Sequence, residues 1–328
     1  MLQLFRRFDW SLALVLAVLA VALRAVGLLL APAGIEGGLD ALGPLGHWLP
    51  AARAGDQLGG WLLGALSVVA LGALGAHTLN YYRLGAAGMV PALVAVLLGS
   101  AAAWWLGFTP YFAAALLLAL ATQRLFGGYR HQGAALPVFD CGLLLGGAWL
   151  IAPPFAWFGL WAALALGQLR KLKGADLLKL VIGLAALPFI AGTWAYVWGD
   201  VVAFRQNLFS GVVGEDIVAG FGESWWTLAV LALVSGACVG AFGRLTARRP
   251  IQEQRAMRMY YTMLAVSWVA VLASGATGRE ALALQLYPVS ILLGLWLSEF
   301  DRRSADVVLL VAIAVSAAGY AYFLLAPT

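Results

Sequence analysis

The sequence predicts an all-α, polytopic transmembrane helix bundle, and three observations support this fold class. Hydrophobic residues make up 63% of the 328 residues and charged residues only 11%, whereas soluble proteins carry roughly 25% charged residues. The chain also contains long apolar stretches, and a helix needs about 20 apolar residues to cross a hydrocarbon core about 30 Å thick. The short segments between the stretches alternate between rich and poor in Lys and Arg. We expect a single integral membrane domain over residues 1–328.

Eleven helical spans follow from the apolar stretches. The first is long and has no clear small-residue cleavage site, so it is expected to remain as a helix rather than be removed as a signal peptide. The fourth is short and begins at Pro110, and only Pro153 and Pro154 separate the fifth from the sixth. The predicted spans are residues 10–31, 59–77, 88–106, 110–126, 135–152, 154–169, 175–198, 225–245, 259–275, 281–297 and 305–325.

The distribution of basic residues predicts the orientation, because Lys and Arg in short loops favour the cytoplasmic side. With the N-terminus in the cytoplasm, most basic residues fall in cytoplasmic loops. The outer set contains only Arg53, Arg205 and Arg279, and Arg24 lies inside the first span. An odd number of spans then places the C-terminus outside. This charge distribution favours membrane lipids as partners of the basic loops and no nucleic-acid partner.

Two predicted outer loops, residues 32–58 and 199–224, are longer than the usual connections of a compact bundle. They hold most of the polar residues on the outer side. Glu36, Asp40 and His47 lie in the first of these loops, and long loops often carry functional residues. Glu36, Asp40 and His47 are therefore candidate functional residues of this loop, with His47 as a candidate ligand-binding residue.

Tryptophans gather near the predicted outer boundary. Trp104, Trp105 and Trp198 belong to this group, whereas Trp10 stands alone at the inner end of the first span. One interpretation is an interfacial aromatic belt, in which the indole ring lies in apolar surroundings and its N–H stays hydrated. The other is an outward cavity whose aromatic walls bind a lipid-linked or sugar-bearing ligand.

Arg24 is a further candidate ligand-binding residue, because charged side chains inside membrane spans are costly. It lies roughly 10 Å below the outer boundary at the helical rise of about 1.5 Å per residue. Its side chain either extends outward to Glu36 or Asp40, or it holds a phosphate or carboxylate in an outer cavity.

Metal and haem sites are not expected. The three histidines, His47, His77 and His131, cannot share one site, because the predicted topology places His47 on the other side of the membrane. Cys141 and Cys238 both lie within spans and form no C-x-x-C motif. No cofactor is identified by any motif.

Two resemblances add expectations. Residues 76–200, with the stretches L-N-Y-Y-R-L, F-T-P-Y-F-A-A-A-L-L-L-A-L-A-T-Q-R-L-F and V-F-D-C-G-L-L-L-G-G-A-W-L-I-A-P-P-F-A-W-F, resemble a multi-pass inner-membrane family of Bacteroidota that is catalogued as a domain of unknown function. The match covers a pattern of spans and contains no catalytic signature. It implies an inner-membrane protein with the same helical architecture.

The second resemblance is to membrane glycosyltransferases that use polyprenyl-phosphate sugars. The segment A-L-R-A-V-G-L-L around Arg24, followed by a long loop with Glu36 and Asp40, is similar to the end of their first span and their first outer loop. It implies that the outer carboxylate acts as general base and that Arg24 holds the lipid-linked phosphate. The acidic pair followed by Tyr that is usual in those enzymes is missing here, which favours an inactive relative among them.

These observations predict an integral membrane protein that serves as a non-catalytic subunit or scaffold of a cell-envelope assembly, with other membrane-protein subunits as partners. The alternative is a glycosyltransferase-like enzyme, or an inactive relative, that takes a lipid-linked sugar at an outward-facing cavity. Short cytoplasmic loops without a firm catalytic constellation favour the first function. The polar outer loops and the tryptophans favour the second.

Overall fold

The computed structural model describes residues 5, 9–30, 42–46, 57–84, 88–100, 108–130, 136–169, 173–214, 217–241, 243, 246, 249–276 and 279–299. Regular structure in these residues is helical, apart from an isolated β-bridge between Ser210 and Val213. The prediction of an all-α fold is therefore confirmed.

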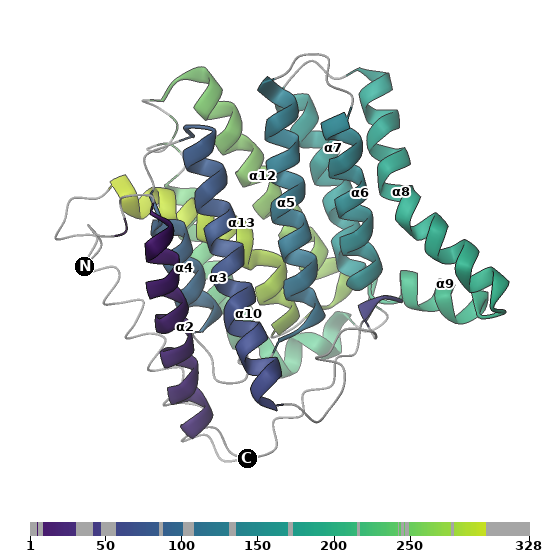
Figure 1. Ribbon diagram of the computed structural model, residues 1–328, viewed down its shortest axis with the longest axis horizontal. Coiled ribbons are helices and arrows are strands. Elements are labelled where there is room, and N and C mark those ends of the chain that lie inside the picture. Colours follow the sequence, from purple (N-terminus) through teal and green to yellow (C-terminus); the bar gives the residue numbers. More distant parts are fainter. Residues whose placement is uncertain are drawn as a thin grey trace.

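The described part of the chain forms a series of α-helices and one short 3-10 helix, which pack as a bundle (Figure 1). In chain order they are α2 (Trp10–Leu30), α3 (Gln57–Tyr81), α4 (Val90–Gly99), α5 (Pro110–Arg130), α6 (Leu136–Ile151), η4 (Pro153–Trp157), α7 (Phe158–Leu169), α8 (Gly174–Val197), α9 (Val201–Phe209), α10 (Ile217–Gly240), α12 (Ile251–Ser274) and α13 (Arg279–Glu299).

Five of these helices, namely α3, α5, α8, α12 and α13, contain a segment that is long and apolar enough to cross a membrane. Shorter apolar segments lie in α2, α4, α6 and α10. These features identify a membrane protein with several passes. The total of eleven spans and the side on which each terminus lies stay predictions, and the last predicted span, residues 305–325, lies outside the described residues.

The interior of the bundle is built around α13, whose sides meet α3, α4, α5, α10 and α12. Large side chains fill this centre, among them Tyr111 of α5, Tyr260 of α12 and Tyr287 of α13, all fully buried. Trp161 of α7 is also fully buried, and its indole N–H donates to the carbonyl of Met259 at 3.1 Å. These contacts join α7 to the start of the apolar part of α12.

Helices α6 and α8 approach so closely that their contact requires glycine. A Cβ atom on Gly146 of α6 would lie only 2.5 Å from the carbonyl oxygen of Leu184. Gly142 and Gly183 meet the backbone of the opposite helix in the same way. In a membrane, small residues allow this type of packing because helix association there depends on close van der Waals contact.

The described basic residues of the predicted cytoplasmic set belong to one end of the bundle. The C-terminal ends of α3 and α5 and the N-terminal ends of α8 and α12 lie together at the top of Figure 1. The neighbouring sequence carries Arg83, Arg124, Lys173, Lys179 and Arg249. α9, whose sequence contains Arg205, does not lie at this end (Figure 1). Which end faces the cytoplasm stays a prediction.

The structure corrects the prediction of a long loop over residues 199–224. This region contains α9, and α10 begins at Ile217, eight residues before the predicted start of its span. Residues 205–207 of α9 are polar and α9 is only nine residues long, so a search for apolar spans overlooks it. Gly220, Gly222 and Glu223 lower the hydropathy at the start of α10 in the same way.

Candidate functional site

Most of the predicted site residues lie outside the described part of the chain. Glu36, Asp40, His47, Trp104 and Trp105 belong to this group. Arg24 lies in α2, but its side chain is outside the described residues. The catalytic roles of Glu36 and Asp40, and the ligand-binding roles of Arg24, His47, Trp104 and Trp105, therefore stay predictions.

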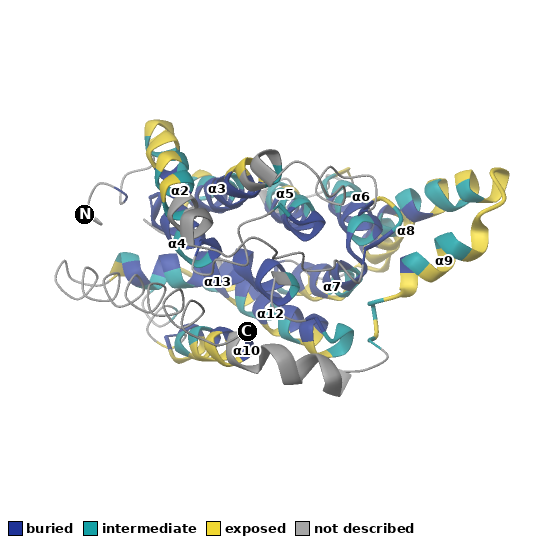
Figure 2. Ribbon diagram, turned by 90° about the horizontal axis from the view of Figure 1, so that it is seen from below, coloured by how far each residue is buried: buried dark blue, intermediate teal, exposed yellow. Residues whose placement is uncertain are grey.

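Trp198 is described, and it follows the last residue of α8 with 70% of its surface exposed. Its ring packs against the ring of Trp194 one turn earlier, with the centroids 5.7 Å apart. Figures 1 and 2 both show α2 at one side of the molecule and the end of α8 at the opposite side. The structure therefore does not bring Trp198 together with α2, the helix of Arg24.

Trp198 instead belongs to a projecting hairpin made of the second half of α8 and the whole of α9, residues 189–209, which we call the α8–α9 arm. Pro188 lies inside α8 and lacks the N–H that a helix interior uses. Beyond it, α8 leads away from the bundle, and the arm is exposed over most of its length (Figures 1 and 2). The hairpin turns at Gly199, whose φ of 80° favours glycine.

The arm is apolar and aromatic on its exposed surface. The exposed fractions of Trp194, Tyr196, Val197 and Trp198 lie between 68% and 75%. Within the arm, the two helices pack on each other where the ring of Phe204 lies against Gly192 of α8, so that a Cβ on this glycine would be 3.2 Å from the ring.

Two tryptophans of the bundle hold the base of the arm. The indole N–H of Trp149 in α6 donates to the carbonyl of Leu208 at 3.0 Å, and the ring of Trp149 meets the ring of Phe209 edge to face. The indole N–H of Trp157 donates to the carbonyl of Val212, also at 3.0 Å. These contacts fix where the chain leaves α9, so the arm has an anchored base and a free outer part.

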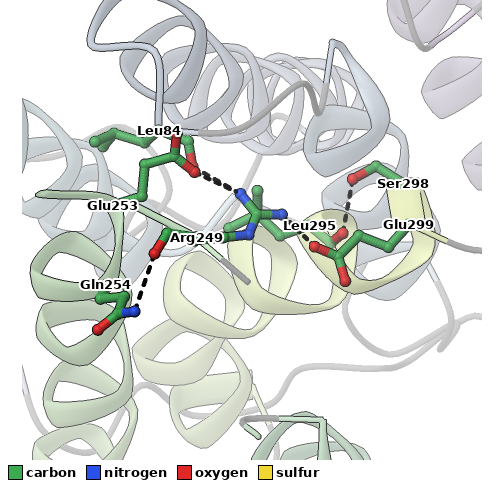
Figure 3. Close-up of polar contacts among 7 residues, drawn as sticks. All are labelled: Leu84, Arg249, Glu253, Gln254, Leu295, Ser298 and Glu299. Carbon is green, nitrogen blue, oxygen red and sulfur yellow. Dashed lines mark hydrogen bonds and ion pairs between the residues drawn. The ribbon is translucent and has the colours of Figure 1, made fainter. Parts of the chain in front are cut away.

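At the basic end of the bundle, Arg249 forms polar contacts with Leu84, Glu253 and Glu299, and we call this group the Arg249 clamp (Figure 3). Its guanidinium donates to the carbonyl of Leu84 at 3.3 Å and to the carboxylate of Glu253 at 3.1 Å. It also forms an ion pair with Glu299 at the end of α13. Because one guanidinium joins the turn after α3 to α12 and α13, the clamp holds three segments together and serves the fold.

The described residues contain no group of three or more His, Cys, Asp or Glu side chains placed to hold a metal ion. Cys141 and Cys238 are free and buried. His77 lies between aromatic rings, with its centroid 5.7 Å from that of Trp10 and 5.6 Å from that of Tyr81. This histidine therefore packs within an aromatic stack that joins α2 to α3.

Comparison with known proteins produces no match, because no protein family, curated protein or solved structure is sufficiently similar to this chain. The resemblances to a Bacteroidota membrane family and to membrane glycosyltransferases therefore stay predictions. Among the described residues, the α8–α9 arm is the feature on which a functional proposal can be based.

Most of the arm is not apparent from the sequence. The predicted group of outer tryptophans contains Trp198, but nothing in it links Trp198 to Phe189, Tyr196 and Phe204 of the same arm. The available signal is the density of aromatic residues that begins after Pro188 and continues on both sides of Gly199. The interior contact of Trp149 with Leu208 had no signal in the sequence, because 59 residues separate the two.

Proposed function

We propose that this chain is a non-catalytic subunit of a membrane assembly in the cell envelope, located in the bacterial inner membrane. Its α8–α9 arm is the surface that contacts a transmembrane helix of another subunit. The observation that carries this proposal is the exposure of α8. Only 17% of the most apolar part of α8 is buried, against 56% to 83% in the other four long apolar helices.

Exposure to lipid alone does not account for an arm that projects. Lipid chains are as apolar as the side chains, so helices associate in a membrane through close packing rather than through removal from water. The outer part of α8 does not pack against the bundle, and among the described residues it packs against α9. A helix of a partner subunit in the angle between the arm and the bundle would supply the missing packing.

The residue types of the arm suit such a contact. Trp and Tyr are enriched among the residues that contribute most to protein interfaces, because they bury a large area with few rotatable bonds. Trp194, Tyr196 and Trp198 provide these side chains on the exposed surface. Arg205 and Gln206 of α9 are exposed and polar, which favours a position of α9 at the edge of the membrane rather than within it.

Purification of the full chain from its native membranes tests the proposal. The test variant replaces Phe189, Trp194 and Trp198 with alanine. A matched control replaces Leu14, Val15 and Val18, which are exposed by 51% to 70% on α2 at the opposite side of the molecule. We expect a partner in fixed stoichiometry with the wild type and the control, and its loss from the arm variant. Equal retention of every co-purified protein by the two variants would contradict the proposal.

The glycosyltransferase-like alternative is tested separately. It depends on Glu36, Asp40 and Arg24, whose side chains lie outside the described residues. Replacement of Glu36 by Gln and of Asp40 by Asn would abolish transfer from a lipid-linked sugar if the alternative holds. The subunit proposal expects both variants to keep the partner and to show the same transfer as membranes that lack the chain.

A further inference from the structure

A groove lies between α10 and α12, on a part of the bundle distinct from the α8–α9 arm. Its volume is about 310 Å³, at the lower end of the roughly 300–1,000 Å³ of small-molecule sites. Its walls are formed by small and apolar side chains, with Trp268 and Tyr261 as the aromatic members. The lining residues are Ala232, Ser235, Gly236, Val239, Tyr261, Leu264, Ala265 and Trp268.

The groove opens onto the apolar outer surface of the bundle. On α10, Leu233 and Val239 are exposed by 74% and 57%, and on α12 Val269 is exposed by 43%. In a membrane this surface faces lipid chains, so the groove is filled from the hydrocarbon phase rather than from water.

The floor of this apolar groove is polar. Ser235 is 4% exposed, and its hydroxyl donates to the side-chain oxygen of Gln285 at 3.1 Å. Gln285 of α13 is fully buried, and its amide nitrogen has no hydrogen-bond partner among the described residues. Buried polar groups without a partner are costly in proteins, and in native structures they require an explanation such as a bound water or ion.

We propose that the groove between α10 and α12 binds one membrane-dissolved, chain-like lipid molecule that carries a single hydrogen-bonding oxygen, which contacts Ser235. The Ser235 hydroxyl keeps a lone pair for a ligand hydroxyl while it donates to Gln285. If the Gln285 amide turns to present its nitrogen, Ser235 is free to donate to a ligand carbonyl instead. The ligand is therefore a lipid alcohol or a lipid ketone.

A pair of glycines on α10 provides a matched test. A Cβ atom added at Gly236 or at Gly240 has open space around it, with no atom within 4 Å beyond the local helix, and both positions are exposed on α10. Gly236 lines the groove, whereas Gly240 does not. Leucine at Gly236 is therefore expected to fill the groove, and leucine at Gly240 is expected to leave it open. Ala265→Leu fills the groove from α12 and serves as a second blocking variant.

The experiment uses the full chain in phosphatidylcholine nanodiscs with three photoactivatable probes, namely hexadecanol, 2-hexadecanone and hexadecane, each with a diazirine in mid-chain. Labelled residues are located by mass spectrometry. The proposal expects the alcohol or the ketone to label the lining residues more than the alkane does. Ser235→Ala should reduce this labelling to the level of the alkane, roughly three- to tenfold, the effect of one net hydrogen bond.

Gly236→Leu and Ala265→Leu should abolish the labelling, and Gly240→Leu should keep it, with all variants unfolding at the wild-type temperature. Equal labelling by the alkane and both oxygen-bearing probes would overturn the proposal. So would equal labelling of the Gly236 and Gly240 variants. If both glycine variants instead dissociate an oligomer of this chain, the surface binds a helix and the lipid proposal is wrong.

Discussion

The indole N–H of Trp149 donates to the carbonyl of Leu208 at 3.0 Å, and this bond ties the base of the α8–α9 arm to helix α6. The bond closes a loop that contains the rest of α6, all of α7 and α8, and most of α9. It is one of the contacts that position the arm, together with the bond from Trp157 to the carbonyl of Val212, and it joins two residues that are distant in sequence. Its contribution can be measured without changing the arm itself.

Trp149→Phe keeps an aromatic ring beside Phe209 but removes the donor to Leu208. A net hydrogen bond of this kind contributes about 0.5–1.5 kcal/mol. We expect faster hydrogen exchange of the backbone amides of α9 in the variant, with little change elsewhere in the bundle. Trp194→Phe, in the exposed part of the arm, serves as the control. Equal protection of α9 in the two variants would show that the anchor has no effect on the arm.

Arg249→Met is expected to destabilise the protein by about 1–2 kcal/mol, because charge-assisted hydrogen bonds contribute about 1.5–3 kcal/mol and solvent weakens those to partly exposed partners. The side chain of Arg249 is 14% exposed, and the side chains of Glu253 and Glu299 are 24% and 37% exposed. Thermal unfolding in nanodiscs measures the loss. The control is Arg258→Met, at an exposed position of α12, the helix that begins two residues after Arg249. A similar loss of stability in both variants would contradict a special role of the clamp in the fold.

Gly183→Ala tests the close crossing of α6 and α8. The added methyl group would collide with the backbone of α6, and overpacking of this kind costs about 1–3 kcal/mol. Gly167→Ala in α7 is the matched control, since a Cβ there meets nothing within 4 Å. It should stabilise α7 by up to about 1 kcal/mol through helix propensity. If the unfolding temperature falls equally in both variants, the crossing is not as tight as described.

The start of α2 should respond to acid. The backbone N–H of Ser11 donates to the carboxylate of Asp9 at 3.0 Å, and this bond lowers the pKa of Asp9 below its usual value. A lowered pKa means that the ionised group stabilises the helix start above the unfolded pKa of about 3.9. The contribution is lost as the pH falls through the lower, folded pKa. The amide resonance of Ser11 should follow this titration in the wild type and show no such step in Asp9→Ala.

The helices that enclose the bundle centre were predictable because their apolar stretches end at charged residues or at proline. The prediction for residues 110–126 differs from α5 only at its C-terminal end, which continues to Arg130. α9 escaped prediction because Arg205, Gln206 and Asn207 make it polar.

The position of the arm could not be predicted from composition. α8 is apolar on all sides, so its sequence does not show which face packs on α6. Pro188 lies inside one continuous apolar stretch, and the stretch alone is compatible with a straight span. By its predicted depth alone, Trp198 therefore belongs with Trp104 and Trp105. Only the tertiary structure shows that the end of α8 lies far from α2.

Photo-cross-linking in native membranes is the most direct test of the subunit proposal. A photoreactive amino acid replaces Val197 in the arm, which is 72% exposed, or Val18 in α2, which is 62% exposed. We predict that position 197 forms a cross-link to one protein of defined mass, and that position 18 forms cross-links only to lipid. Cross-links to lipid alone at position 197, or the same protein captured from both positions, would contradict the proposed role of the arm.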